Sequence, residues 1–231
     1  MNQKEKIAMF KKVILLFLFA FAVSFICPGQ SYAVVTLEPT DDAPTYSAYP
    51  NTNQDTGYPN DSLWTGKFYS IYDTRSYLKF DLSAIPVNLE TATLWLYNSR
   101  SSWPEAPGLS TFAPAVVNTY LTSNAWTESA ITWNNQPALG TASGSTTVNN
   151  PVGWYSWDVS NIAKTAQGGF FSIAMTSDGA GHVYYGKDNI CPGPYLDVTM
   201  TPEPVSSILF ITGGATLAVR RCWKRKHSGI V

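Results

Sequence analysis

The sequence predicts an all-β protein, folded as an antiparallel β-sandwich of jelly-roll type. Apolar and polar residues alternate in many short segments, the pattern of strands with one buried face. Gly, Pro, Asn, Asp and Ser separate these segments at short intervals. No unit of roughly 20–50 residues repeats along the chain, which argues against a propeller or a solenoid. Many short strands without alternating helices are typical of two packed antiparallel sheets.

Two segments show the alternation most clearly. In SYLKFDLS, residues 76–83, every second position from 78 to 82 is Leu or Phe. In ATLWLYN, residues 92–98, apolar residues alternate with Thr93, Trp95 and Tyr97. Strands are also expected in seven further segments: DSLWTGKFY (61–69), FAPAVVN (112–118), AITW (130–133), WYSWDVS (154–160), FFSIAMT (170–176), HVYYGK (182–187) and PYLDVTM (194–200).

One short helix is expected in SNIAKTAQGG, residues 160–169. Ser160 or Asn161 provides a cap, and Gly168 marks the end. This length allows one or two turns.

The first 33 residues have the features of a secretory signal peptide. Four lysines precede the apolar run VILLFLFAFAVSFI, and the segment ends in SYA, which suits cleavage after Ala33. Cys27 belongs to this leader, because Phe25 and Ile26 before it do not suit a lipoprotein cleavage site. An uncleaved membrane anchor is the alternative.

Residues 34–201 form one predicted domain, and this domain is acidic. It contains six Lys and Arg against 14 Asp and Glu, a net charge near −8, although the whole chain has a net charge of −1. Nucleic-acid binding depends on clustered cations, so this class of partner is excluded. The charge also argues against polyanionic ligands, except beside a local basic patch. Cys191 is the one cysteine of this domain, so an internal disulfide is excluded.

No catalytic site is indicated, and we expect the protein not to be an enzyme. His182 is the one histidine of the domain, and Cys191 lies nine residues further on, but no third group that would orient such a pair is signalled. The spacing needed for a zinc site is missing. The 14 acidic residues leave open a glycosidase pair, and therefore a small glycan-active enzyme.

Calcium is the one cofactor that the sequence suggests. Four aspartates lie in a region rich in Pro, Asn and Gly, where oxygen ligands can hold a structural Ca²⁺. The candidates are Asp41 and Asp42, with Asp55 and Asp61 further along. A solvated acidic loop is the alternative, because no segment matches an EF-hand.

The domain holds 24 aromatic residues, more than a core readily absorbs, which indicates an aromatic surface. If the segments at 76–83 and 92–98 are neighbouring strands with their leucines inside, the residues between those leucines share the outer face. Flat rings beside hydrogen-bonding groups form a shallow sugar site. The candidate set is Arg75, Tyr77, Lys79, Trp95, Tyr97, Trp64 and Trp103. The alternative is that Trp95 packs under the 98–111 loop.

Five segments together resemble the DNRLRE domain: RSYLKFDLSAIP (75–86), TATLWLY (91–97), AWTESAITWNNQPA (125–138), GWYSWDVSNIAK (153–164) and PYLDVTM (194–200). That family is similar to the disaggregatase-related modules and to alginate-binding carbohydrate-binding modules. The resemblance implies a jelly-roll accessory module of polysaccharide-active or cell-surface proteins, with carbohydrate binding in some members. An alginate-binding module would favour a cationic face, and this domain departs from that pattern.

WTESAITWNNQP is the most specific part of the resemblance, and its residues suit a loop, a strand and a second loop. Ile131 and Trp133 are expected to point into the sandwich. The carboxylate of Glu128 is expected to accept backbone N–H groups at a turn, and Asn134 and Asn135 to form the turn after the strand.

Residues 202–226 resemble the PEP-CTERM sorting signal. TPEP, at 201–204, is followed by the apolar run 205–219 and by RRCWKRK. Membership implies a Gram-negative bacterium in which an exosortase processes the protein and passes it to the cell surface or the exopolymer matrix. The residues concerned are Pro202, Glu203, Pro204, Arg220 and Arg221. Fifteen residues as a helix span about 22 Å, which suits a transient helix across the inner membrane. A permanent anchor is the alternative.

These observations give three hypotheses for the function. The first is an exported cell-surface or matrix protein whose sandwich binds a polysaccharide or exopolymer without catalysis. The second is a structural or adhesive matrix protein without a sugar site. The third is a small polysaccharide-active enzyme.

Overall fold

The computed structural model describes residues 3, 5, 32–55, 61–68, 71–85, 88–99, 113–149, 151–189 and 192–201. Most of the predicted signal peptide and the whole sorting segment 202–226, including the helix expected at 205–219, lie outside the described residues. Trp103 and Cys191 lie outside them too. Within the described ranges, no helix has the length and apolar character needed to cross a membrane.

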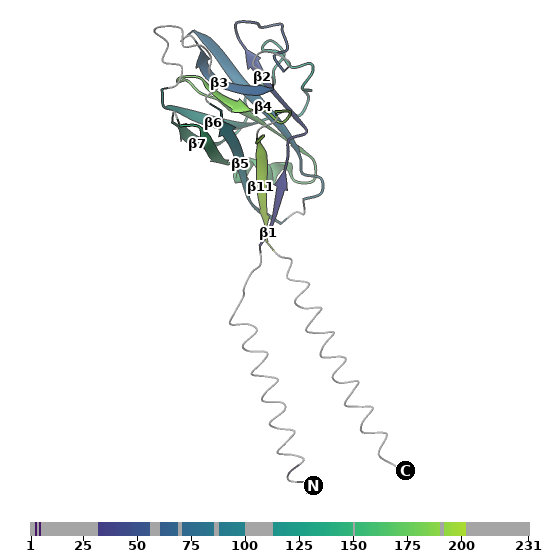
Figure 1. The fold of residues 1–231 in the computed structure, drawn as a ribbon. Coiled ribbons are helices and arrows are strands. Elements are labelled where there is room, and N and C mark those ends of the chain that lie inside the picture. Colours follow the sequence, from purple (N-terminus) through teal and green to yellow (C-terminus); the bar gives the residue numbers. More distant parts are fainter. Residues whose placement is uncertain are drawn as a thin grey trace. The chain divides into compact units, whose positions relative to one another are not determined.

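The structure confirms the predicted fold class, an all-β antiparallel sandwich (Figure 1). The strands are β1 (Ala33–Leu37), β2 (Asp41–Tyr46), β3 (Ser62–Phe68), β4 (Tyr72–Asp81), β5 (Leu89–Asn98), β6 (Ala115–Thr122), β7 (Ala142–Val148), β8 (Gly153–Asp158), β9 (Phe170–Thr176), β10 (His182–Tyr185) and β11 (Tyr195–Met200). The predicted helix is present as α2 (Ser160–Ala163), which continues as the 3₁₀ turn η1 (Lys164–Ala166). Gly168 follows with a φ of 79°.

Two sheets make up the sandwich. In sheet A, β5 is central, with β8 on one side and β11 and β10 on the other; β1 continues from β11, and β3 from β10. In sheet B, the order is β2, β4, β9, β6 and β7. All of these strand pairs are antiparallel. The expectation that residues 76–83 and 92–98 form neighbouring strands is therefore wrong, because β4 and β5 belong to opposite sheets.

Strand β3 joins the two sheets. Its residues 62–65 pair with β10 of sheet A, and its residues 66–68 pair with β4 of sheet B. The change occurs at Gly66, which has a φ of 108°. A Cβ there would lie 2.6 Å from the carbonyl oxygen of Ala180. Both the backbone angle and the close contact require glycine at this position.

The main core lies between the sheets. Leu78 and Phe80 of β4 point inward from sheet B, and Leu94 and Leu96 of β5 point inward from sheet A. Trp157 fills the same layer, and its indole Nε1–H donates to the carbonyl of Val117 at 2.9 Å. The inward residues confirm the alternation expected for both strands, so the residues between them face outward.

Eight of the nine expected strands are present, and AITW at 130–133 is not one of them. This segment forms turns, because side-chain amides bind its backbone. Asn53 Nδ2 donates to the carbonyl of Ile131 at 2.9 Å, and the Thr132 N–H donates to Asn135 Oδ1 at 2.6 Å. Asn134 and Asn135 lie in a turn, as expected.

Candidate functional site

The outer face of sheet A carries a row of aromatic side chains, here called the aromatic face. It consists of Trp95 and Tyr97 of β5, Trp154 of β8, Tyr185 of β10 and Tyr195 of β11. The strand register brings them together, since Trp154 is the cross-strand partner of Tyr97 and Tyr195 is the partner of Trp95. Two of the five, Trp95 and Tyr97, belong to the set predicted from the sequence.

The five rings form a continuous chain of contacts. Trp95 stacks on Tyr195 with 6.1 Å between ring centroids, and Tyr97 stacks on Tyr185 with 5.7 Å. Trp154 joins the two stacked pairs, with its centroid 5.4 Å from Tyr97 and 5.0 Å from Tyr195. Because β5 separates β8 from β11, the Trp154 indole reaches across β5. These contacts fix the orientations of the rings relative to one another.

The aromatic face is accessible to solvent. The Trp154 residue is 39% exposed, and the other four are partly exposed. Partial burial raises the pKa of Tyr195, and the nearby carboxylate of Asp197 raises it further. An apolar surface with hydroxyl groups at its edges suits a ligand that is apolar on one side and polar at its rim, as a sugar ring is.

A polar row lies beside the rings on the same face. Asp158 of β8 and Asp197 of β11 both pair with Thr93 of β5, two residues along the strand from Trp95. Thr36 of β1 extends the row and donates to Asp197 Oδ1 at 2.6 Å. Hydrogen bonds from the Ser160 side chain and backbone lower the pKa of Asp158. The row therefore offers hydroxyl groups and carboxylates next to the aromatic platform.

The outer face of sheet B is covered by the loop 124–139. Tyr77 is fully buried, and its hydroxyl contacts Gln136 Oε1 at 3.0 Å and the carbonyl of Pro137 at 3.2 Å. Burial raises the pKa of this phenol. Ile131 packs in the same small cluster, on the outside of sheet B. The expectation that Ile131 points into the sandwich is wrong.

Lys79 holds this loop against the outer face of sheet B. Its ammonium donates to the carbonyl of Trp126, lies 4.5 Å from the centroid of the Trp126 ring, and pairs with Asp41 at 3.4 Å. Arg75 lies 5.1 Å over the ring of Trp133. The structure thus separates the predicted sugar-binding residues, with Trp95 and Tyr97 on one sheet and Arg75, Tyr77 and Lys79 under a loop on the other.

Trp64 of the predicted set is also buried. It packs with Tyr46, Phe68 and Val183 in a third apolar cluster. Its ring centroid is 5.8 Å from that of Tyr46 and 5.9 Å from that of Phe68. These contacts are those of a core residue.

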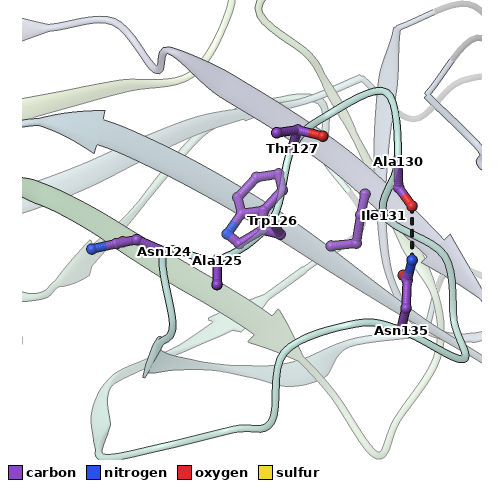
Figure 2. Close-up of a pocket in the computed structure, with 7 residues that line it drawn as sticks. All are labelled: Asn124, Ala125, Trp126, Thr127, Ala130, Ile131 and Asn135. Atoms are coloured by element: carbon purple, nitrogen blue, oxygen red, sulfur yellow. Dashed lines mark hydrogen bonds between the residues drawn. The ribbon is translucent and has the colours of Figure 1, made fainter.

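A pocket of about 380 Å³ opens in the covering loop (Figure 2). Its lining is Asn124, Ala125, Trp126, Thr127, Ala130, Ile131 and Asn135. The amides serve the loop itself, since Asn135 Nδ2 donates to the Ala130 carbonyl and Asn124 Nδ2 to that of Phe170. The Trp126 residue is only 7% exposed, and Lys79 occupies one face of its ring. This pocket offers a ligand less aromatic surface than the aromatic face does.

Three carboxylates meet at one edge of sheet B. Oxygens of Asp42, Asp55 and Glu128 lie within 4.8 Å of one another. Burial raises the pKa of Asp42 and that of Asp55 to about 7 each, and the Glu128 carboxylate adds to both shifts. Lys187 offsets part of this charge, with Nζ 2.8 Å from Glu128 Oε1 and its backbone N–H 2.8 Å from Asp42 Oδ2.

These oxygens are ligands that Ca²⁺ accepts. The structure brings together two of the four predicted aspartates, Asp42 and Asp55, and adds Glu128, which had been expected to bind backbone N–H groups. Asp41 instead pairs with Lys79 and accepts the Glu128 N–H at 3.3 Å. The carbonyl of Asp61 accepts the Gly186 N–H at 2.6 Å. Calcium binding stays a prediction.

His182 is fully buried in β10. Burial lowers the pKa of this imidazole to about 4, and the backbone of Ala113 opposes the shift only in part. The side chain is neutral at physiological pH and packs in the interior.

The fold is that of a β-sandwich module, and the outer face of sheet A carries the aromatic rings. Residues 33–199 match the model of carbohydrate-binding module family 96, and the chain belongs to this family. The predicted relationship to carbohydrate-binding modules is thereby confirmed. The closer resemblances, to the DNRLRE domain and to the PEP-CTERM signal, stay predictions.

One curated relative and two solved structures are also similar. A gellan lyase from a Bacillus species is 27% identical over 194 residues, which are 78% of this chain but 7% of the lyase. The chain therefore spans a small fraction of that enzyme.

The K1 cleaved adhesin domain of Lys-gingipain from Porphyromonas gingivalis is 11% identical, with a TM-score of 0.31 over 75% of this chain and 99% of that domain. A structure described as a basis for the promiscuous specificity of carbohydrate-binding modules of the β-sandwich superfamily is 12% identical, with a TM-score of 0.21 over 75% of this chain and 56% of the other. Scores this low carry no argument about shared function.

Proposed function

We propose that this protein is an exported, non-catalytic module that binds a polysaccharide through the aromatic face. Membership of a carbohydrate-binding module family supports the ligand class. The observation that carries the choice of site is the row of five contacting rings, which stays partly exposed beside a row of hydroxyl and carboxylate groups. Sugar C–H faces pack on the rings, and sugar hydroxyl groups bind the polar row.

The proposed site is tested by alanine substitution in the full-length protein. The ligand is the best binder in a panel of polysaccharides, which includes gellan because of the name of the related lyase. Trp154→Ala is expected to weaken binding about 30-fold, because a central aromatic anchor contributes about 2 kcal/mol. Circular dichroism should show an unchanged fold, since Trp154 is a surface residue.

Phe170→Ala is the matched control. Phe170 lies on β9 of sheet B and is 50% exposed, so it is an accessible aromatic residue outside the aromatic face. The Phe170→Ala variant should bind the polysaccharide with the affinity of the unmodified protein. Full affinity in Trp154→Ala, or an equal loss in Phe170→Ala, would contradict the proposed site.

The export route is a separate part of the proposal. Residues 1–33 act as a cleaved signal peptide, and residues 202–226 act as a sorting segment that an exosortase processes near Pro202, Glu203 and Pro204, after transient insertion of 205–219 into the inner membrane. The support is the order of features at each end of the sequence. The basic residues that include Arg220 and Arg221 would remain on the cytoplasmic side.

Mass spectrometry of the protein from producing cells tests this route. We expect an N-terminus at residue 34, a C-terminus close to residue 202 and recovery from the surface or matrix fraction. Recovery of the unprocessed chain from the cytosol would contradict it, whatever the outcome of the binding experiments.

A further inference from the structure

We infer that the ligand of the aromatic face is an uncharged polysaccharide and not a polyuronate. This inference rests on the proposed function, and it names the class of glycan that the site accepts. It follows from the distribution of charge around the five rings.

The polar row next to the rings carries negative charge. Asp158 and Asp197 flank Thr93 on its two sides, and Thr93 lies two residues before Trp95 on β5. Two residues along a strand span about 7 Å, which is less than the Debye length of about 10 Å at 0.1 M salt. A polyuronate lying on the rings would bring its carboxylates within the unscreened range of both aspartates. An uncharged chain avoids this repulsion.

The strands of sheet A offer no compensating cations. β1, β5, β8, β10 and β11 contain no Lys or Arg, and neither do residues 62–65 of β3; Lys67 lies in the part of β3 that pairs with sheet B. Of the cations in the described ranges, Lys164 in η1 is the one whose charge acts on Asp158, and it contributes only the smallest part of the lowered pKa of that carboxyl. The charge of this lysine therefore offsets little of the negative charge beside the rings.

The other described cations are engaged away from the aromatic face. Lys67 pairs with Asp73 at 2.7 Å, and Lys187 pairs with Glu128 at 2.8 Å. Arg75 lies over Trp133, and Lys79 lies under Trp126. Each of these partners belongs to sheet B or to its covering loop, so the contacts hold the cations on that side of the molecule.

The carboxylates also suit an uncharged ligand directly. Ionised Asp accepts hydrogen bonds and donates none, while sugar hydroxyl groups donate. Asp197 Oδ1 accepts from Thr36, and Asp158 Oδ1 accepts from Ser160. Each carboxylate has a second oxygen, which can accept from a hydroxyl group of the glycan.

The test measures binding of the full-length protein, in EDTA, to two neutral polysaccharides, mixed-linkage β-glucan and galactomannan, and to two polyuronates, alginate and polygalacturonate. EDTA removes divalent cations that could bridge carboxylates. A neutral polysaccharide should bind, with an affinity that changes less than about twofold between 20 and 300 mM NaCl, because uncharged ligands are not screened. Binding to the polyuronates should be at least about tenfold weaker and should strengthen with salt.

A double variant sharpens the test. Asp158→Asn with Asp197→Asn removes the negative charge while keeping side-chain size, so polyuronate binding should rise several-fold and neutral binding should weaken. Polyuronate binding that is stronger than neutral binding and is lost in Trp154→Ala would overturn the inference but leave the proposed site standing. Binding of either class that Trp154→Ala does not affect would overturn the proposed site as well.

Discussion

The outer faces of the two sheets are built from similar side chains, and one of them is covered. On sheet B, the loop 124–139 lies over Tyr77 and Lys79, which bind the loop through its backbone and through Gln136. On sheet A, Trp95 and Tyr97 occupy equivalent alternating positions but contact other surface rings and remain partly exposed. An outward-facing aromatic residue therefore stabilises the fold where a distant loop returns over it, and stays partly exposed where no loop of the described residues does. Most of the 98–111 loop, the alternative cover for Trp95, lies outside the described residues.

The largest expected effect is the difference in stability loss between a tryptophan substitution on the covered face and one on the aromatic face. Trp126→Ala should lower the free energy of unfolding by about 3–5 kcal/mol, because it empties the cluster under the loop and removes the ring that Lys79 contacts. Trp154→Ala should cost less than about 1 kcal/mol. Urea denaturation of both variants provides the measurement. Equal losses would mean that the aromatic face is also a structural layer.

Calcium gives the next largest effect, at the edge of sheet B. If Asp42, Asp55 and Glu128 bind Ca²⁺, a calcium concentration 100 times the dissociation constant should add about 2.7 kcal/mol to the free energy of unfolding at pH 8. The gain should shrink at pH 5, where carboxyl groups with a pKa of about 7 are protonated. Thermal melts with calcium and with EDTA measure it. No difference between them at pH 8 would remove calcium from the account.

Without metal, the pH dependence of stability at this site follows from Asp42. The folded-state pKa of Asp42, about 7, lies above its ordinary value of 3.8, so its contribution to stability is full below about pH 4 and is lost as the pH rises to about 7. In EDTA at pH 8, Asp42→Asn should therefore be more stable than the unmodified protein, by about 1–3 kcal/mol.

The measurement is the difference in free energy of unfolding between Asp42→Asn and the unmodified protein, followed from pH 4 to pH 8. Buried His182, with its pKa lowered to about 4, has the opposite effect, since it destabilises the fold as the pH falls below 6.5. It is present in both proteins and cancels. A stability difference independent of pH would show that folding leaves the pKa of Asp42 at its ordinary value.

The smallest expected effect is the loss of stability on removal of a tyrosine hydroxyl group from each face. Tyr77→Phe removes a buried hydroxyl that contacts Gln136 and the Pro137 carbonyl, and should cost about 1–2 kcal/mol. Tyr195→Phe on the aromatic face should cost less than about 0.5 kcal/mol. Chemical denaturation resolves this difference, and a larger loss at Tyr195 would reverse the assignment of the two faces.

The sequence predicts the central strands better than the edges. β5 and β11 are recognised because one side of each is buried and alternation results. β4 and β9 are buried on both sides, and they are recognised by the Leu, Phe, Ile and Met residues of their inward sides. β1, β2 and β7 were not predicted, and each pairs with a single neighbour. β2 contains Pro44, which an edge strand tolerates, and β7 (ASGSTTV) is mostly small and polar. Edge strands carry less of the burial pattern that sequence analysis reads.

The aromatic face was predicted only in part, for a related reason. Alternation shows that Trp95 and Tyr97 point outward, but it does not show which strands lie next to β5. Trp154, Tyr185 and Tyr195 were not predicted as site residues because they come from strands far along the chain. The pattern in WYSWD gives one usable signal, since buried Trp157 implies that Trp154 faces the opposite way. The pairing of β4 with β2 and β9 depends on the whole sandwich, which alternation cannot reveal.

The indole N–H signals in a ¹H–¹⁵N spectrum report which sheet the polysaccharide contacts. Trp95 and Trp154 lie on the aromatic face, whereas Trp126 and Trp157 are buried and their Nε1–H groups donate to Ser172 and Val117. When the full-length protein is titrated with the polysaccharide that it binds best, the signals of Trp95 and Trp154 should shift, and those of Trp126 and Trp157 should stay. Shifts at Trp126 with none at Trp154 would place the ligand on sheet B and contradict binding at the aromatic face.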